Sequence, residues 1–193
     1  MPLAYHTIFG LYAFWLPNDP RGSWSTFVGS WDLFRFGRAT KVDTRRSVAH
    51  VPHDAAVRRA AKRTLKYEPV VLSGRQARAV GAGFARACGE GSYAIYECSI
   101  LPEHVHLVIR HEDRSVGRML GHLKARATQQ LAREGLWPDE ARPVWGGPGW
   151  KVFLDTPADV RRAIAYVAAN PQREGKPPQR WSFVTPFDEE HGE

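Results

Sequence analysis

Alternating apolar and polar residues mark out a strand pair in the middle of the chain. Residues 93–101 are rich in β-branched and apolar side chains, and residues 104–110 read His-Val-His-Leu-Val-Ile-Arg. Side chains along a strand point alternately to opposite faces of a sheet. Pro102 and Glu103 leave room only for a tight connection, so the pattern predicts an antiparallel hairpin.

Three stretches show helical periodicity instead. Helices are expected over residues 53–67, over 73–88 with Ser73 as N-cap and the glycine-rich residues 89–91 as terminator, and over 115–134. The third is amphipathic. Its apolar face is formed by Leu120, Leu123, Ala127 and Leu131, and Gly135 and Pro138 end it.

The clearest helix start follows a short strand over residues 151–154. Thr156 stands at the N-cap position, Pro157 at the first helical position, and Asp159 where its carboxylate can reach back to the cap. The helix is expected to run to about Asn170, because Pro171 follows.

The ends of the chain complete a single-domain arrangement over residues 1–193. Residues 6–16 predict a first strand, and the turn formers of 17–22 break it. Residues 23–51 are irregular and are interpreted as an insertion or a binding loop. They begin a wider region, 23–92, that is assigned only as an insertion or loop region, and residues 177–193 form a short polar tail. The element order favours the α+β class, with an antiparallel sheet and helices mainly on one face.

Charge and cysteine content narrow the function classes. The net charge of +7 and the excess of Arg over Lys favour an anionic partner, of which nucleic acid is the commonest. Two cysteines, Cys88 and Cys98, are too few for a disulfide framework. No apolar run approaches the roughly 20 residues that cross a bilayer, and no leader-like segment begins the chain. A cytoplasmic location without membrane association is therefore expected.

Two histidines on the second hairpin strand are candidate metal ligands. His104 and His106 are two residues apart, so they share a face while Val105, Leu107 and Ile109 point into the core. Adjacent imidazoles at this spacing can chelate a divalent cation. The alternative is that the pair is ordinary polar decoration on a half-exposed strand.

Tyr166 and Asn170 form the second candidate constellation. They are four residues apart on the last predicted helix and share one of its faces. If this face looks toward the histidines, Asn170 can supply an oxygen ligand and Tyr166 a phenol nucleophile. A phenol needs activation at neutral pH, because its ordinary pKa is near 10. Taken alone, Tyr166 is also compatible with simple packing, and Asn170 with a helix end.

These segments resemble a known family. LPEHVHLVI (residues 101–109) is similar to the metal-binding strand of the HUH single-tyrosine transposases, and YVAANP (166–171) to the nucleophile helix of their REP-associated branch. Between them, MLGHLKARATQQL is similar to an intervening helix with a lysine where Lys124 stands, and PVWGGPGWKVFL to a Trp-containing loop and strand. The resemblance spans residues 93–171, and more weakly 5–22; residues 23–92 depart from the family pattern.

The resemblance implies a ferredoxin-like fold and a Mg²⁺- or Mn²⁺-dependent reaction on single-stranded or hairpin DNA. Tyr166 carries over as the nucleophile that forms a 5′-phosphotyrosine link, His104 and His106 as metal ligands, and Asn170 as a third ligand. It leaves the oligomeric state open between monomer and homodimer, and the recognised hairpin, preferred metal and mobility of the element undetermined.

Basic and aromatic residues near these motifs are candidates for binding the DNA strand. They are Arg114, Arg118, Lys124, Arg126, Arg133, Arg161, Arg162, Arg173, Trp145 and Trp150, with Trp181 a further candidate for base stacking. Each is also compatible with a solvated helix face or with core packing.

Two other functions stay open beside strand transfer. A domesticated relative would bind structured DNA or RNA without cutting it, and no covalent adduct would form. A metal-dependent phosphoester hydrolase would use water as nucleophile and would release free 5′-phosphate ends.

Overall fold

The computed structural model describes residues 1–42, 48, 50–137, 139, 141–147 and 149–188. Its elements are β1 (Ala4–Gly10), α1 (Trp31–Phe34), α2 (Ala55–Arg63), α3 (Gly74–Gly91), β2 (Ile95–Ile100), β3 (His104–Arg110), α4 (Val116–Arg133), β4 (Trp150–Leu154) and α5 (Pro157–Arg173). All strand pairs are antiparallel, in the sheet order β2-β3-β1-β4. The α+β class is therefore confirmed.

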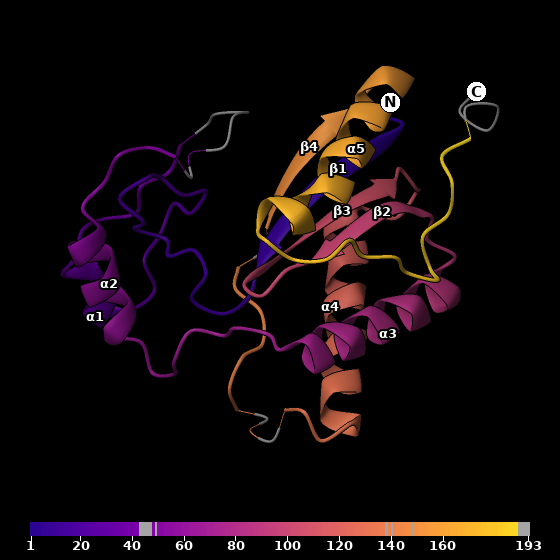
Figure 1. The fold of residues 1–193 in the computed structure, drawn as a ribbon. Helices are drawn as coiled ribbons and strands as arrows, with labels where there is room; N and C mark the ends of the chain where they lie inside the picture. The colour runs from indigo at the N-terminus through magenta and orange to yellow at the C-terminus, as the bar shows by residue number, and fades with distance from the viewer. Residues whose placement is uncertain (43–47, 49, 138, 140, 148, 189–193) are drawn as a thin grey trace.

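The order β1-α3-β2-β3-α4-β4, with β1 and β3 at the centre, is the ferredoxin-like topology. Helices α3 and α4 cover one face of the sheet, and α5 lies across the other (Figure 1). The larger core lies under α3 and α4 and includes Phe84, Leu107 and Leu123. A smaller cluster joins Val108 to Val160 and Val167 of α5. Each face of the sheet thus has its own apolar layer.

The local start signals act as the sequence predicts. Ser73 and Gln76 form a capping box at α3, and Thr156 and Asp159 form another at α5. The first strand, however, is shorter than expected. It ends at Gly10, and the chain then turns away, with Ala13 at φ 66°. After Gly10, Leu11 packs in the main core and Leu16 in a separate apolar cluster, whereas Phe14 and Trp15 line a cavity.

Helix α5 continues through Pro171, where it was expected to stop. Proline cannot donate the hydrogen bond that the carbonyl of Val167 would otherwise accept. In this structure the Ser99 hydroxyl of β2 donates to the Val167 carbonyl oxygen at 2.6 Å. The carbonyl therefore stays satisfied, and α5 gains one further turn that carries Glu174 at its C-cap.

The described residues between β1 and α3, which include α1 and α2, form a small lobe beside the sheet (Figure 1). A separate apolar cluster of Leu16, Val28, Leu33 and Ala61 holds it together. This lobe accounts for most of the region that the sequence left unassigned. Within the described residues, no helix is long and apolar enough to cross a membrane.

Gly83 allows α3 and α4 to approach closely. A Cβ atom on Gly83 would lie 2.4 Å from the Ala127 Cα and 2.6 Å from its backbone nitrogen. Backbone atoms cannot rotate away, so we expect Gly83→Ala to lower the free energy of unfolding by about 1–3 kcal/mol. Urea denaturation measures this change. Gly89→Ala is the matched control in the same helix.

The control should have the opposite sign. A Cβ atom on Gly89 would meet no other atom within 4 Å, so alanine there should raise helix stability by roughly 0.5–1 kcal/mol. Equal effects of the two substitutions would contradict the close packing of α3 on α4.

Candidate active site

Strand β3 presents His104 and His106 to the α5 face of the sheet. Val105 and Leu107 point to the opposite core, whereas Val108 packs with the α5 residues. The two imidazole rings are 5.0 Å apart between centroids. The sequence prediction that these histidines share a face opposite the main core is confirmed by this packing.

A third histidine, His6 of β1, completes the cluster. Its Nε2 lies 3.1 Å from Nδ1 of His106, in a hydrogen bond between two buried rings. Sequence reasoning gave His6 no role, because it is separated from His106 by 100 positions. Only the register of β1 on β3, which sets His6 opposite Val108, brings the two rings together.

Tyr166 of α5 lies directly against this cluster. Its ring centroid is 5.6 Å from that of His6 and 5.8 Å from that of His106, both in edge-on geometry. The side chain is 41% exposed, while His106 is 5% exposed. A half-exposed phenol thus stands over two buried imidazoles, which is the convergence that the sequence motifs predicted.

Asn170 and Glu174 follow Tyr166 at successive helical turns. Asn170 is 6% exposed, and its Nδ2 has no hydrogen-bond partner among the described residues. Glu174, which the sequence analysis did not single out, places Oε1 3.6 Å from Nε2 of His104. Burial, followed by the neighbouring charge of Glu103, raises the pKa of Glu174. The role of Asn170 as a metal ligand stays a prediction.

An open cavity of about 920 Å³ extends from these residues toward the lobe. His6, His104, His106, Tyr166 and Glu174 line one part of it. The glycines of the loop before β4 line another part. Gly149 has φ 93°, and a Cβ there would lie 2.7 Å from the Ile8 carbonyl oxygen, so this loop can pass close to β1 only with glycine.

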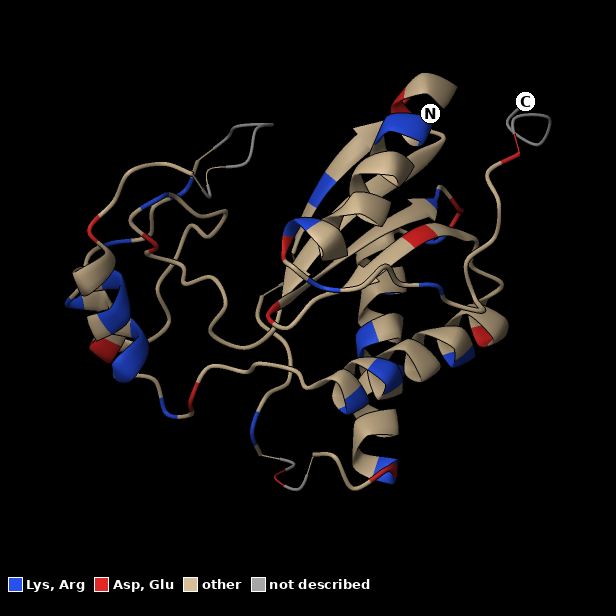
Figure 2. Ribbon diagram, in the orientation of Figure 1, with Lys and Arg blue, Asp and Glu red and all other residues tan. Residues whose placement is uncertain are grey.

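The predicted DNA-binding residues divide between the two faces of the sheet. Trp150 and Arg162 line the cavity, and the Arg173 guanidinium lies 4.9 Å from the centroid of the Tyr166 ring. Arg161 is an exposed residue of the same helix. The remaining basic candidates lie on α4 or just before it, across the sheet from Tyr166; they are Arg114, Arg118, Lys124, Arg126 and Arg133. Figure 2 shows the basic residues distributed over several helices rather than gathered on one face.

Several of the predicted DNA-binding residues have contacts within the protein. The side chains of Arg114, Arg126, Arg133 and Arg162 pair with Tyr93, Glu90, Gln130 and Asp159, respectively. Lys124 donates from Nζ to the Gly147 carbonyl oxygen at 2.9 Å, and burial lowers its pKa to about 8. Trp145 packs against Phe9 and Phe84, and its Nε1 donates to the Lys124 carbonyl oxygen at 3.1 Å. These contacts link the glycine-rich loop of residues 145–149 to α4, on the face of the sheet opposite Tyr166. Trp181, at the tail, packs on the same core.

Burial keeps the histidines of the site neutral. It lowers the pKa of His6 to about 4 and of His104 to about 4. The pKa of His106 falls to about 2, first through burial and then through the charges of His104 and His6. Neutral imidazoles have lone pairs available for a cation at neutral pH.

The same shifts predict acid sensitivity of the metal-free protein. The unfolded chain takes up protons on these histidines near pH 6.5, whereas the folded chain does not, so stability is fully present above pH 6.5 and falls below it. Between pH 6.5 and 5 we expect a loss approaching about 1.4 kcal/mol per pH unit for each histidine. Urea denaturation in EDTA measures it, and His6→Gln should remove about one proton from the slope. A flat profile would contradict neutral burial.

A metal at this site would need ligands of more than one kind. Among the described residues, no group of three or more His, Cys, Asp and Glu side chains could hold a metal ion. Two atoms nevertheless stand buried and unpartnered in this part of the chain, Nδ1 of His104 and Nδ2 of Asn170. Unmade hydrogen bonds of this kind cost about 1–3 kcal/mol each.

Comparison with known proteins gives structural similarity only. No protein-family model and no curated protein matches the sequence. A solved REP-associated tyrosine transposase bound to a REP hairpin is similar at a TM-score of 0.48 and 13% identity, covering 90% of this chain and 69% of that one. A candidate transposase from Deinococcus radiodurans is similar at 0.44 and 11%, covering 88% and 91%. Identities this low assign no activity to the present chain.

Proposed function

We propose that this protein is a transposase-type enzyme that nicks and rejoins single-stranded DNA through Tyr166. The observation that carries the proposal is the convergence of a half-exposed phenol with buried, neutral imidazoles in one open cavity. Tyr166 comes from α5, His6 from β1 and His106 from β3, so three separate elements meet at this point. Packing alone would not require a buried histidine pair beneath an exposed tyrosine.

The reaction exchanges one phosphoester bond for another and transfers one proton. The Tyr166 oxygen forms a bond to the phosphorus of a phosphodiester, and the bond from phosphorus to the 3′ oxygen breaks. The phenol loses one proton and the released 3′ oxygen gains one. The 5′-phosphotyrosine link keeps the energy of the broken ester, so the reverse attack by a 3′ hydroxyl rejoins the strand without another energy source.

A divalent cation such as Mg²⁺ or Mn²⁺ would be held by His104 and His106, with the side-chain oxygen of Asn170 as a further ligand. Its chemistry would be to polarise the scissile phosphate. His6 would act as a positioning residue. In the tautomer in which Nδ1 of His106 donates to Nε2 of His6, the other nitrogen of His106 keeps its lone pair for a ligand.

Net charge and the cavity lining favour a DNA strand as substrate. The chain carries a charge of +7, and Arg162 and Arg173 flank Tyr166 on α5. The REP hairpin held by one structurally similar transposase suggests hairpin DNA as the first substrate to test.

The test uses single-stranded hairpin DNA from the flanks of the protein's own gene. The protein is incubated with this labelled DNA in Mg²⁺ or Mn²⁺, and denaturing gels are inspected for a protein–DNA adduct. Strand transfer predicts an adduct and a free 3′ hydroxyl. Tight binding without an adduct would identify a non-cleaving binding protein instead, and free 5′-phosphate ends without an adduct would identify a hydrolase.

A further inference from the structure

An aromatic stack forms the wall of the cavity that faces the lobe. The indole rings of Trp24 and Trp150 lie 5.3 Å apart with only 7° between their planes. Trp15 stacks on Trp24 at 6.3 Å, and the Arg21 guanidinium lies 3.8 Å from the centroid of the Trp15 ring. All four side chains line the cavity that holds Tyr166.

Sheet register places this wall close to the reacting group. Ile8 of β1 pairs with His106 on one side and with Trp150 on the other, so the three residues form one row across the sheet. Directly paired residues project from the same face. Two strand spacings, about 10 Å, therefore separate the backbones of His106 and Trp150.

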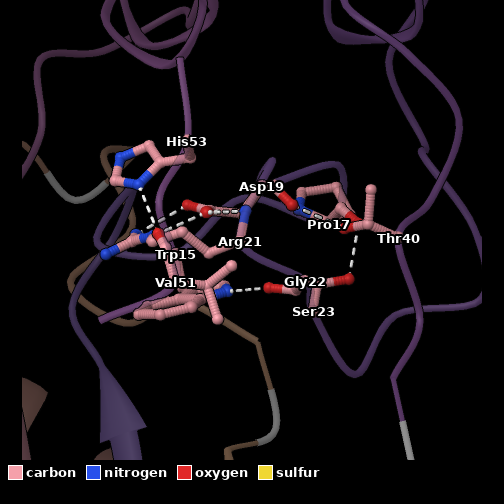
Figure 3. Close-up of polar contacts among 9 residues, drawn as sticks. All are labelled: Trp15, Pro17, Asp19, Arg21, Gly22, Ser23, Thr40, Val51 and His53. Atoms are coloured by element: carbon pink, nitrogen blue, oxygen red, sulfur yellow. Dashed lines mark hydrogen bonds and ion pairs between the residues drawn. The ribbon is translucent and has the colours of Figure 1, made fainter. Parts of the chain in front are cut away.

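Hydrogen bonds fix the base of the stack in place (Figure 3). Asp19 is fully buried and accepts two hydrogen bonds from Arg21, each 2.7 Å long, while Nε1 of Trp15 donates to the Gly22 carbonyl oxygen at 2.7 Å. Because Asp19 balances its charge, Arg21 serves as a flat end to the stack rather than as a phosphate ligand. A rigid surface of this kind loses little conformational entropy on binding.

Internal packing does not account for the whole stack. Trp24 is 37% exposed, whereas the structural Trp145 packs between Phe9 and Phe84 and satisfies its Nε1 within the protein. In the described part of the chain, the indole N–H groups of Trp24 and Trp150 have no hydrogen-bond partner, and the N–H of Trp150 is not buried. The wall thus offers planar apolar surface together with free donors.

We propose that Trp24 and Trp150 form a platform on which one unpaired nucleobase stacks, beside the phosphodiester that Tyr166 attacks. This inference rests on the proposed function, and it adds that the lobe helps to bind the DNA strand. Indole surfaces bind every base through its flat face, so the platform holds the strand without selecting its sequence. The lobe then contributes Trp24 to the site, and β4 contributes Trp150.

The experiment measures binding of a fluorescent hairpin DNA with unpaired flanks by anisotropy in EDTA, so that no strand is cut. Trp24→Ala should weaken binding roughly ten- to a hundredfold, and Trp24→Phe should weaken it less. Trp31→Ala is the matched control, since Trp31 belongs to the same lobe, is 87% exposed and lies outside the cavity lining. Between about 50 and 200 mM salt, the slope of log K against log salt should stay that of the wild type, because no phosphate contact is lost.

An abasic scan separates direct stacking from damage to the lobe. Abasic nucleotides replace the unpaired positions one at a time, and each DNA is measured with wild type and with Trp24→Ala. Stacking predicts one position whose abasic form weakens wild-type binding but adds no further loss to the variant.

Each remaining outcome has a definite meaning. Losses that add at every position, or unchanged binding by Trp24→Ala, would overturn the platform; an adduct formed by the wild type would then leave the proposed function standing. Absence of any binding of single-stranded DNA by the wild type would overturn both.

Discussion

Tyr166→Phe is expected to remove the covalent protein–DNA adduct, lowering its rate of formation by ~10³-fold or more. The substitution deletes only the phenolic oxygen. The ring keeps its edge-on contacts with His6 and His106, and the backbone of α5 is unchanged. DNA affinity in EDTA should therefore equal that of the wild type. Denaturing gels measure the adduct, and anisotropy measures the affinity.

Tyr96→Phe is the matched control for this prediction. Tyr96 is a half-buried residue of β2 that packs against Phe187 and lies outside the cavity lining. It loses the same hydroxyl without touching the site, so its adduct should form at the wild-type rate. Recovery of an adduct from Tyr166→Phe would exclude Tyr166 as the nucleophile, whatever the control shows.

The sequence predicts best what is local. Side-chain alternation assigns His104 and His106 to one face, because the period of a strand is two. The starts of α3 and α5 are predicted from the cap residues Ser73 and Thr156, because capping involves only the next three positions. The shared face of the two histidines and the starts of the two helices are confirmed, because each depends only on neighbouring residues in the sequence.

What the sequence could not give depends on contacts between distant strands. His6 joins the site through the register of β1 on β3, and α5 passes Pro171 because Ser99 of β2 satisfies the Val167 carbonyl. Neither partner can be recognised from the residues beside it. A histidine on a predicted strand that could pair with residues 104–110 is the signal that could have pointed to His6.

The two tryptophans of the glycine loop show the same limit. Trp145 and Trp150 are five residues apart and equally suited to base stacking from their sequence context. Trp145 packs on the core beneath α4, whereas Trp150 begins β4 and projects toward α5. The basic residues of α4 were placed near the site for a similar reason, since a helix pattern does not reveal which face of a sheet the helix covers.

The second large effect is expected at the histidines. His106→Ala should lower both Mn²⁺ affinity and the rate of adduct formation by on the order of 10²-fold or more, because a buried neutral imidazole is replaced by a methyl group. His104→Ala should act similarly. His6→Gln should lower Mn²⁺ affinity and the rate of adduct formation by roughly 10- to 100-fold. It alters the group that orients His106 but leaves His106 itself in place.

This graded order distinguishes a metal site from a packing cluster. His111→Ala is the matched control, since His111 directly follows β3 and its ring contacts that of Tyr5 in a tilted geometry, outside the cavity lining. Calorimetric titration with Mn²⁺ gives the affinity, and denaturing gels give the adduct rate. If the three histidines served packing alone, their substitution would lower thermal stability while Mn²⁺ affinity stayed at the level of His111→Ala. His6 and His106 are buried to nearly the same extent, so a packing role predicts similar effects of their substitution. A loss of Mn²⁺ affinity that is largest for His106, smaller for His6 and absent for His111 would instead show that the imidazoles act on the cation.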